Sequence, residues 1–327
     1  MMREDRRAVA AWLLICAAVV FVIVVVGGIT RLTRSGLSIV EWQPLIGALP
    51  PFSDADWQAL FAKYRETPQF KRVNFDMQLD GFKRIFWWEY AHRLLGRLAG
   101  LVFLAPFLYF LARRRLDAPL AGKLAVVFLL GALQGALGWW MVKSGLVDDP
   151  RVSQFRLTAH LGMALLIFGF QLWIAFGLLD QNRREPVKPK TLIPLLVFLM
   201  ALSGGMVAGI RAGSAYNTFP LMNGHLVPPE ILMLEPWWRN FGYNMATVQF
   251  VHRGFFWLLC ILIPLAWWKA RGKGSSTVLL AAFVLQAGLG IATLLLKVPV
   301  VLAAAHQAGA VLLLAAALWY AHRSQVR

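Results

Sequence analysis

Four of the six histidines recur at matching places in the two halves of the chain, inside apolar segments of membrane-spanning length. His92 and His252 each precede an arginine, and His160 and His306 each follow an alanine. Ionisable side chains inside a membrane span are costly, so they usually mark a functional position. Alternate spans run in the same direction, so we expect the four imidazoles to share one depth. Two facing imidazoles suit the two axial positions of haem iron, which predicts one haem in each half.

Two other interpretations of these histidines stay open. A zinc or copper site normally adds carboxylate or thiolate ligands, and the second half offers none near its histidines. Cys16 and Cys260 lie in apolar segments and form no C-x-x-C motif, so they predict neither a thiolate site nor a disulfide framework. A histidine that only packs explains a single position better than a repeated pair. His225 and His322 have no counterpart and are left out of the ligand set.

One position separates the two halves chemically. Glu89 stands three residues before His92, on the same face of a helix, whereas Gln249 occupies the matching position before His252. Glu89 is the only acidic residue in any predicted span. A buried carboxylate with no evident partner suits proton transfer or the stabilisation of positive charge beside a substrate. The alternative is an interfacial acid that the helix dipole favours near a helix start.

Three arginines stand close to the histidines. Arg93 and Arg253 directly follow His92 and His252, and Arg97 lies one turn after Arg93. Haem carries two propionates, and a guanidinium binds a carboxylate through two parallel hydrogen bonds. We therefore expect propionate contacts at these arginines. The alternative is that they extend toward the membrane surface.

The elements that carry these residues are predicted from composition. Of the 327 residues, 59% are hydrophobic and 15% are charged, and the mean hydropathy is +0.60. Soluble proteins carry nearer a quarter charged residues. Apolar runs of roughly 20 residues, the length that crosses a hydrocarbon core of ~30 Å, recur along the chain. The sequence therefore predicts an all-α integral membrane protein with eight spans, at about 9–29, 87–111, 121–142, 157–179, 191–210, 244–268, 276–296 and 300–321.

The distribution of charge predicts the orientation. A net charge of +17 raises the question of nucleic acid in a soluble protein. Here the basic residues gather in short segments between the apolar runs, as the positive-inside rule predicts. This places both termini in the cytoplasm, with residues 113–123, 180–190 and 269–275 on the same side. Anionic lipid headgroups are the expected partners of these charges, and nucleic acid is excluded.

Five motifs occur in the same order in both halves, which predicts an internal repeat. Gly27-Gly28 matches Gly204-Gly205, for example, and residues 133–138 match residues 285–290. Both halves start on the cytoplasmic side, so the repeat predicts two pseudo-symmetric four-helix bundles, residues 1–185 and 186–327. The long outer loop at 30–86 contains an aromatic and charged stretch around Trp57, which predicts a short amphipathic helix lying on the membrane.

Together these residues resemble the haem A synthase family, most closely its mitochondrial and alphaproteobacterial branch. The likeness covers nearly the whole chain. It includes Glu-Tyr-x-His-Arg at 89–93, the second His-Arg at 252–253 and Gly-Gly-x-Thr-Arg-Leu-Thr-x-Ser-Gly-Leu-Ser at 27–38. Members oxidise the C8 methyl of haem O to the formyl group of haem A by successive hydroxylations and loss of water, for terminal oxidase assembly.

The resemblance implies a role for each residue of the site. Substrate haem O is expected between His92 and His160, and a haem b cofactor between His252 and His306. Glu89 is cast as the residue that acts beside the C8 methyl. The Bacillus-like branch carries a cysteine pair in the first outer loop, and this chain has none there, which excludes an electron route through such a pair.

The resemblance also implies a cellular setting. We expect a multi-pass protein of the bacterial inner membrane, with both haem sites in the outer leaflet half. Haem O synthase and terminal oxidase assembly factors are candidate partners, and the electron acceptor is unidentified. A homo-oligomer is one of the states that the sequence leaves open.

A different functional class uses the same four histidines. A di-haem b-type electron-transfer cytochrome needs both imidazole pairs but has no need of Glu89. A transporter fits the repeated architecture and leaves the histidines unexplained.

Overall fold

The computed structural model describes the chain except for residues 1–2, 44–45, 148, 181–190, 273 and 324–327. The predicted boundary between residues 185 and 186 and most of the predicted basic segment 180–190 therefore lie outside the described residues.

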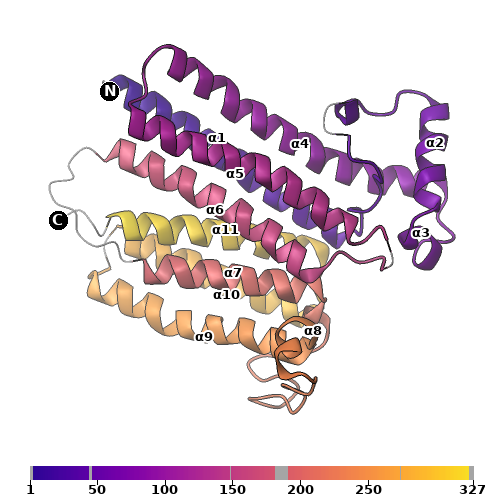
Figure 1. The fold of residues 1–327 in the computed structure, drawn as a ribbon. Helices are drawn as coiled ribbons and strands as arrows, with labels where there is room; N and C mark the ends of the chain where they lie inside the picture. Colours follow the sequence, from indigo (N-terminus) through magenta and orange to yellow (C-terminus); the bar gives the residue numbers. More distant parts are fainter. Residues whose placement is uncertain (1–2, 44–45, 148, 181–190, 273, 324–327) are drawn as a thin grey trace.

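Eight long apolar helices run side by side through the described chain, which confirms the predicted class and number of spans (Figure 1). Their apolar residues surround each helix instead of forming one stripe, as expected where lipid covers the outer face. The described residues contain no strand, only an isolated bridge between Met222 and His225. The spans are α1 (Arg3–Leu32), α4 (Leu79–Ala112), α5 (Ala118–Lys143), α6 (Gln154–Leu179), α7 (Leu192–Gly209), α9 (Met245–Lys269), α10 (Ser275–Leu295) and α11 (Val300–Arg323).

The long connections gather at one end of the bundle. Helices α2 (Asp54–Arg65) and α3 (Pro68–Arg72) follow α1, and α8 (Asn240–Tyr243) precedes α9. Figure 1 places all three at the same end, here called the loop end, opposite the end where α1 begins and α11 finishes. Short turns of 3-10 helix at Ile46–Ala48, Ala212–Ser214 and Trp237–Arg239 complete these connections.

Side-chain caps set the starts of two spans. The Asp117 carboxylate accepts a hydrogen bond from the Leu120 amide, and a proline lies in the first turn of α5. The Asn244 side chain accepts from the amides of Ala246 and Thr247 at the start of α9. Such caps satisfy amides that have no partner inside the helix, which fixes where each span begins.

Helix α4 is longer than predicted. It begins at Leu79, whereas the sequence places the span at 87–111. The extra turns are stabilised by α2, because Trp57 packs edge-on against Phe86, with 5.0 Å between ring centroids, and Tyr64 packs against Phe82. The predicted short helix around Trp57 is thus present as α2. Its Trp57 and Tyr64 side chains are buried against α4, so this aromatic face is not available to a membrane.

The second long loop is held by a buried asparagine and a tyrosine. Asn240 is fully buried and exchanges hydrogen bonds with both main-chain groups of Leu234. The Tyr216 hydroxyl donates to Glu230 at 2.8 Å. Desolvation and this carboxylate raise the pKa of Tyr216 to about 12, so the phenol remains a donor at neutral pH.

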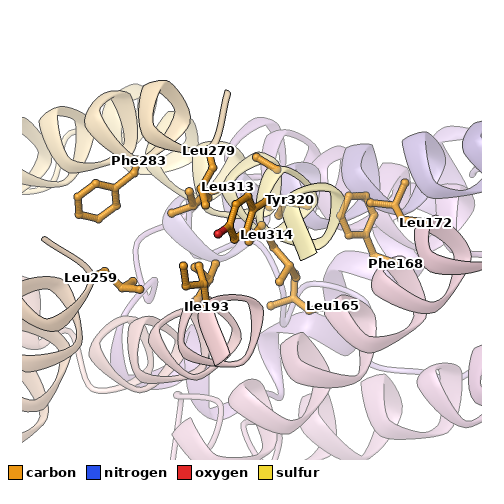
Figure 2. Packing of buried hydrophobic residues seen from close by; sticks show 14 of the residues in the cluster. Leu165, Phe168, Leu172, Ile193, Leu259, Leu279, Phe283, Leu313, Leu314 and Tyr320 are labelled. Atoms are coloured by element: carbon orange, nitrogen blue, oxygen red, sulfur yellow. The ribbon is translucent and has the colours of Figure 1, made fainter. Parts of the chain in front are cut away.

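The first four spans and the last four meet along a continuous apolar core. Helices α1 and α6 of the first group pack against α7 and α11 of the second. Figure 2 shows the side chains at this contact: Leu165, Phe168 and Leu172 come from α6, Ile193 from α7, and Leu313, Leu314 and Tyr320 from α11. The two groups are therefore joined through their interiors.

One part-buried hydrogen bond also crosses this contact. The Gln307 amide of α11 donates to the Val24 carbonyl of α1 at 2.6 Å, and a side chain at Gly28 would collide with that amide. At the matching place, Gly205 of α7 faces the Thr158 hydroxyl and the side chain of Leu161, the residue that follows His160. The Thr158 hydroxyl makes no hydrogen bond to the described residues, so the Gln307 hydrogen bond has no counterpart there.

Gln307→Leu, which copies the residue found after His160, should lower stability by about 1 kcal/mol through loss of this hydrogen bond. Unfolding of the purified protein in detergent measures the effect. Val301→Leu changes a side chain that is 79% exposed on the same helix and is the matched control. Equal unfolding midpoints for Gln307→Leu and the wild type would show that the Gln307 hydrogen bond does not stabilise the contact between α1 and α11.

Candidate functional site

Each of the four repeated histidines packs against a glycine of a neighbouring span. The glycines lack a side chain where the imidazole lies, and a Cβ built on each would come within 3.3 Å or less of the ring carbon Cε1. Contact this close displaces one of the two groups. The pairs are Gly27 with His92 (2.7 Å), Gly138 with His160 (2.9 Å), Gly204 with His252 (3.3 Å) and Gly290 with His306 (2.7 Å).

A main-chain carbonyl one turn before each glycine lies beside the same imidazole. These carbonyls belong to Ile23, Gln134, Met200 and Gln286, each four residues before its glycine. Carbonyl and hydroxyl groups in this position orient metal-ligating histidines. The Nδ1 atom of His252 is also 2.8 Å from the Ser203 hydroxyl. The Nδ1 atoms of the other three are buried, and none makes a hydrogen bond of standard geometry to the described residues.

The structure brings the histidines together in two pairs. His160 lies within electrostatic range of His92, and His252 within range of His306. These are the pairs expected from the sequence, one on α4 and α6 and the other on α9 and α11.

Two glutamines hold the second histidine of each pair in place. The Gln134 amide donates to the main-chain carbonyl of His160 at 3.0 Å, and the Gln286 amide donates to that of His306 at 2.9 Å. Each contact ties the histidine helix to the preceding span. Sequence reasoning recognised these glutamines and glycines as repeated motifs but gave them no role; their recurrence beside each histidine was the available signal.

Glu89 is not the unpartnered carboxylate that the sequence suggested. It is 2% exposed, and one oxygen accepts hydrogen bonds from the Ser38 amide and hydroxyl at 2.7 Å and from the Ile39 amide at 2.9 Å. The other oxygen accepts from Nε and Nη2 of Arg93, at 3.1 and 2.7 Å. Five hydrogen bonds, two of them within an ion pair, compensate the burial of this charge. The partners were missed because Ser38 and Ile39 lie in the long first loop, far from Glu89 in the sequence.

Arg93 fastens the first long loop to α4. Besides Glu89, its guanidinium donates to the main-chain carbonyls of Ile39 at 2.7 Å and Glu41 at 3.0 Å. Arg97, one turn further along, donates to the Gln43 carbonyl at 2.8 Å. The arginines expected at haem propionates thus bind loop carbonyls in the described structure.

Arg253 makes the equivalent contacts in the second half. Its guanidinium donates to Gln249 at 3.0 Å and to four carbonyls of the second long loop, those of Tyr216, Thr218, Pro220 and Leu221. The Gln249 amide in turn donates to the Ala212 carbonyl at 2.8 Å. The second long loop therefore presents a main-chain carbonyl to Gln249 at the place where the first long loop presents main-chain amides to Glu89.

The two remaining histidines lie apart from these pairs. His225 is in the second long loop, where its main chain pairs with Met222. His322 is 1% exposed at the far end of α11, packs edge-on against Trp173 and Phe176, and lies 4.0 Å from Asp180.

Comparison with known proteins gives the family. The model of the COX15-CtaA family, described as a cytochrome oxidase assembly protein, matches residues 10–318. The chain is 58% identical to a heme A synthase of Nitrosospira multiformis and 54% identical to one of Nitrosomonas eutropha, each over 97% of this chain and 93% of the relative. It is 48% identical to a heme A synthase of Parvibaculum lavamentivorans, over 98% of this chain and 95% of the relative. The chain therefore belongs to the COX15-CtaA family.

Proposed function

We propose that this protein is an oxidoreductase of the bacterial inner membrane that converts the C8 methyl of haem O into the formyl group of haem A. The observation that carries this proposal is the pair of glycine-backed imidazoles found twice in a chain so similar to heme A synthases. The product would serve the assembly of terminal oxidases, in keeping with the family description.

The residues of each pair fit a haem. A neutral imidazole binds iron through one ring nitrogen and is oriented through the other. Here three of the Nδ1 atoms are buried, and all four rings lie beside a main-chain carbonyl. His92 and His160 would hold substrate haem O, and His252 and His306 would hold haem b, whose iron supplies one-electron chemistry when bound.

The proposal assigns the halves and the orientation as well. The first four spans form the substrate half and the last four the cofactor half, with both termini in the cytoplasm. The loop end then faces away from the cytoplasm, and both imidazole pairs lie in the outer leaflet half. Haem O synthase, oxidase assembly factors and an unidentified electron acceptor are its candidate partners.

Glu89 would act at the substrate site. Its carboxylate lies on the same helix face as His92, one turn away, and its five hydrogen bonds to Ser38, Ile39 and Arg93 keep it there. A negative charge fixed in a dry site stabilises positive charge that develops nearby without reorganising. Gln249 supplies no such charge beside His252, which is the basis for assigning the reaction to the first half.

Glu89→Gln should leave the protein haem-loaded but less stable, because the side chain keeps its shape and an acceptor for Arg93 while its new NH2 group faces the amides of Ser38 and Ile39. Haem A formation should fall roughly 100-fold, within the range for loss of one charge-stabilising group, and haem O or a hydroxylated intermediate should accumulate. Chromatography of extracted haems measures this, with Glu41→Gln, an exposed carboxylate of the same loop, as control. A normal yield of haem A would rule out the role given to Glu89.

His252→Ala should remove haem b from the purified protein, because an axial ligand is lost. Haems extracted from the wild type should include haem B together with haem O or A, and absorption spectra of the variant should lack the low-spin haem b bands. His225→Ala, in the second long loop, is the control. An unchanged spectrum in His252→Ala would refute this ligand assignment, and haem B alone in the wild type would favour the di-haem cytochrome.

Gly290→Ala should weaken haem b binding by roughly 10- to 100-fold, as expected when a group that positions a metal ligand is disturbed. The added methyl would lie 2.7 Å from Cε1 of His306 and push the ring away. Gly288→Ala, on the same helix, adds the same methyl where no atom lies within 4 Å and should retain haem. Titration of both variants with haem, followed by absorbance, compares them; equal affinities would show that the glycine contact does not position His306.

A further inference from the structure

A positively charged cavity opens at the loop end, apart from the histidine pairs. Its volume is about 640 Å³. It is lined by parts of the first long loop, the connection between α5 and α6, and the residue just past the end of α7. The polar side chains in its wall are Arg34, Gln69, Arg72, Asp149, Arg151 and Arg211.

Positive charge in this wall is not balanced by the described residues. Asp149 is the only carboxylate in the described lining, and Arg151 binds both of its oxygens at 3.0 Å. Arg72 also lies within electrostatic range of Asp149, but within the described residues the guanidinium groups of Arg34, Arg72 and Arg211 make no hydrogen bond and no close ion pair. Desolvation and the charges of Arg34 and Arg151 lower the pKa of Arg211. The four arginines are exposed, and they concentrate positive charge around a space that no described anion fills.

The arginines stand where spans end. Arg34 and Arg211 each follow the last turn of a span, α1 and α7, and Arg151 shortly precedes α6. Arg34 and Arg211 occupy matching positions of the repeat, seven residues after Gly27 and Gly204. Both have a left-handed backbone conformation (φ 57° and 58°). Span ends lie at the depth of lipid headgroups.

The positive-inside rule does not account for this cluster. In the proposed orientation the loop end faces away from the cytoplasm, whereas that rule places arginines of short loops on the cytoplasmic side. The cluster also contains none of the arginines that follow the histidines, because Arg93 and Arg253 bind loop carbonyls. It needs a separate explanation.

We propose that this cavity binds a phosphate group, presented by the headgroup of an anionic phospholipid or by a free phosphate. Guanidinium groups match the oxygens of phosphate through paired hydrogen bonds and remain charged at all working pH values. A bound phosphate would be attracted by these positive charges and would connect the first long loop to the ends of α6 and α7.

The test uses the full-length protein and two variants. Arg34→Gln/Arg211→Gln removes the two matched arginines, and Arg84→Gln removes an exposed arginine of α4 that lies outside the cavity. Thermal unfolding is followed in detergent with added pyrophosphate, against chloride of equal ionic strength, and in nanodiscs of phosphatidylcholine with and without phosphatidylglycerol. A ligand that binds only the folded state raises the midpoint.

We expect pyrophosphate or phosphatidylglycerol to raise the unfolding midpoint of the wild type and of Arg84→Gln. The double variant should bind the same probe roughly 10-fold or more weakly, the loss of affinity expected for one charged hydrogen bond. Stabilisation by phosphatidylglycerol alone supports the headgroup as the source, and stabilisation by pyrophosphate supports free phosphate. If the double variant is obtained in low yield, Arg72→Gln provides a second test, and it too should bind the probe more weakly than the wild type does.

Three outcomes would overturn the proposal. The first is an absence of stabilisation in the wild type by either ligand. The second is equal stabilisation of the wild type and both cavity variants, which would place the anion elsewhere. The third is stabilisation by haem with free propionates, lost with its dimethyl ester and in the double variant, while phosphate has no effect; the cavity would then bind haem carboxylates.

Discussion

The site depends on one steric constraint, the contact between each imidazole and a glycine of the neighbouring span. Because glycine has no Cβ, the ring reaches the helix backbone and lies beside a carbonyl one turn away. A bilayer interior offers no water to orient a histidine, so the backbone of the adjacent helix has to do it. The packing of α1 on α4, α5 on α6, α7 on α9 and α10 on α11 therefore also sets the orientation of the four imidazoles.

The His-Arg pairs extend this constraint to the long loops. In each half the histidine points into the bundle while the next residue, Arg93 or Arg253, binds carbonyls of the loop that precedes the helix. Neighbouring side chains on a helix point in different directions, so one dipeptide can place an imidazole inside the bundle and also bind a loop. The position of each loop is thus coupled to the position of an imidazole.

Periodic features were predictable from the sequence, and contacts between distant segments were not. Eight spans and the pairing of His92 with His160 follow from apolar runs and a repeat, which are local or recurring signals. The hydrogen bonds of Glu89 to Ser38 and the extension of α4 to Leu79 depend on how a long loop folds back over a helix. No pattern in the sequence predicts that the first long loop packs on α4, because the loop residues have no hydrophobic periodicity that would indicate their partner.

The two loop contacts are alike in shape but differ in charge. Glu89 balances Arg93, so the contact beside His92 is neutral, whereas Gln249 leaves Arg253 with its full positive charge beside His252. In a medium of low dielectric constant, one unbalanced charge at this distance is a strong electrostatic difference. Arg97, one turn after Arg93, keeps a positive charge in the first half as well, so the halves differ in where that charge lies: directly beside His252 in the second half, and one turn further along α4 in the first. Two sites built from the same repeat can thus have different affinities and potentials through one substitution of a carboxylate by an amide.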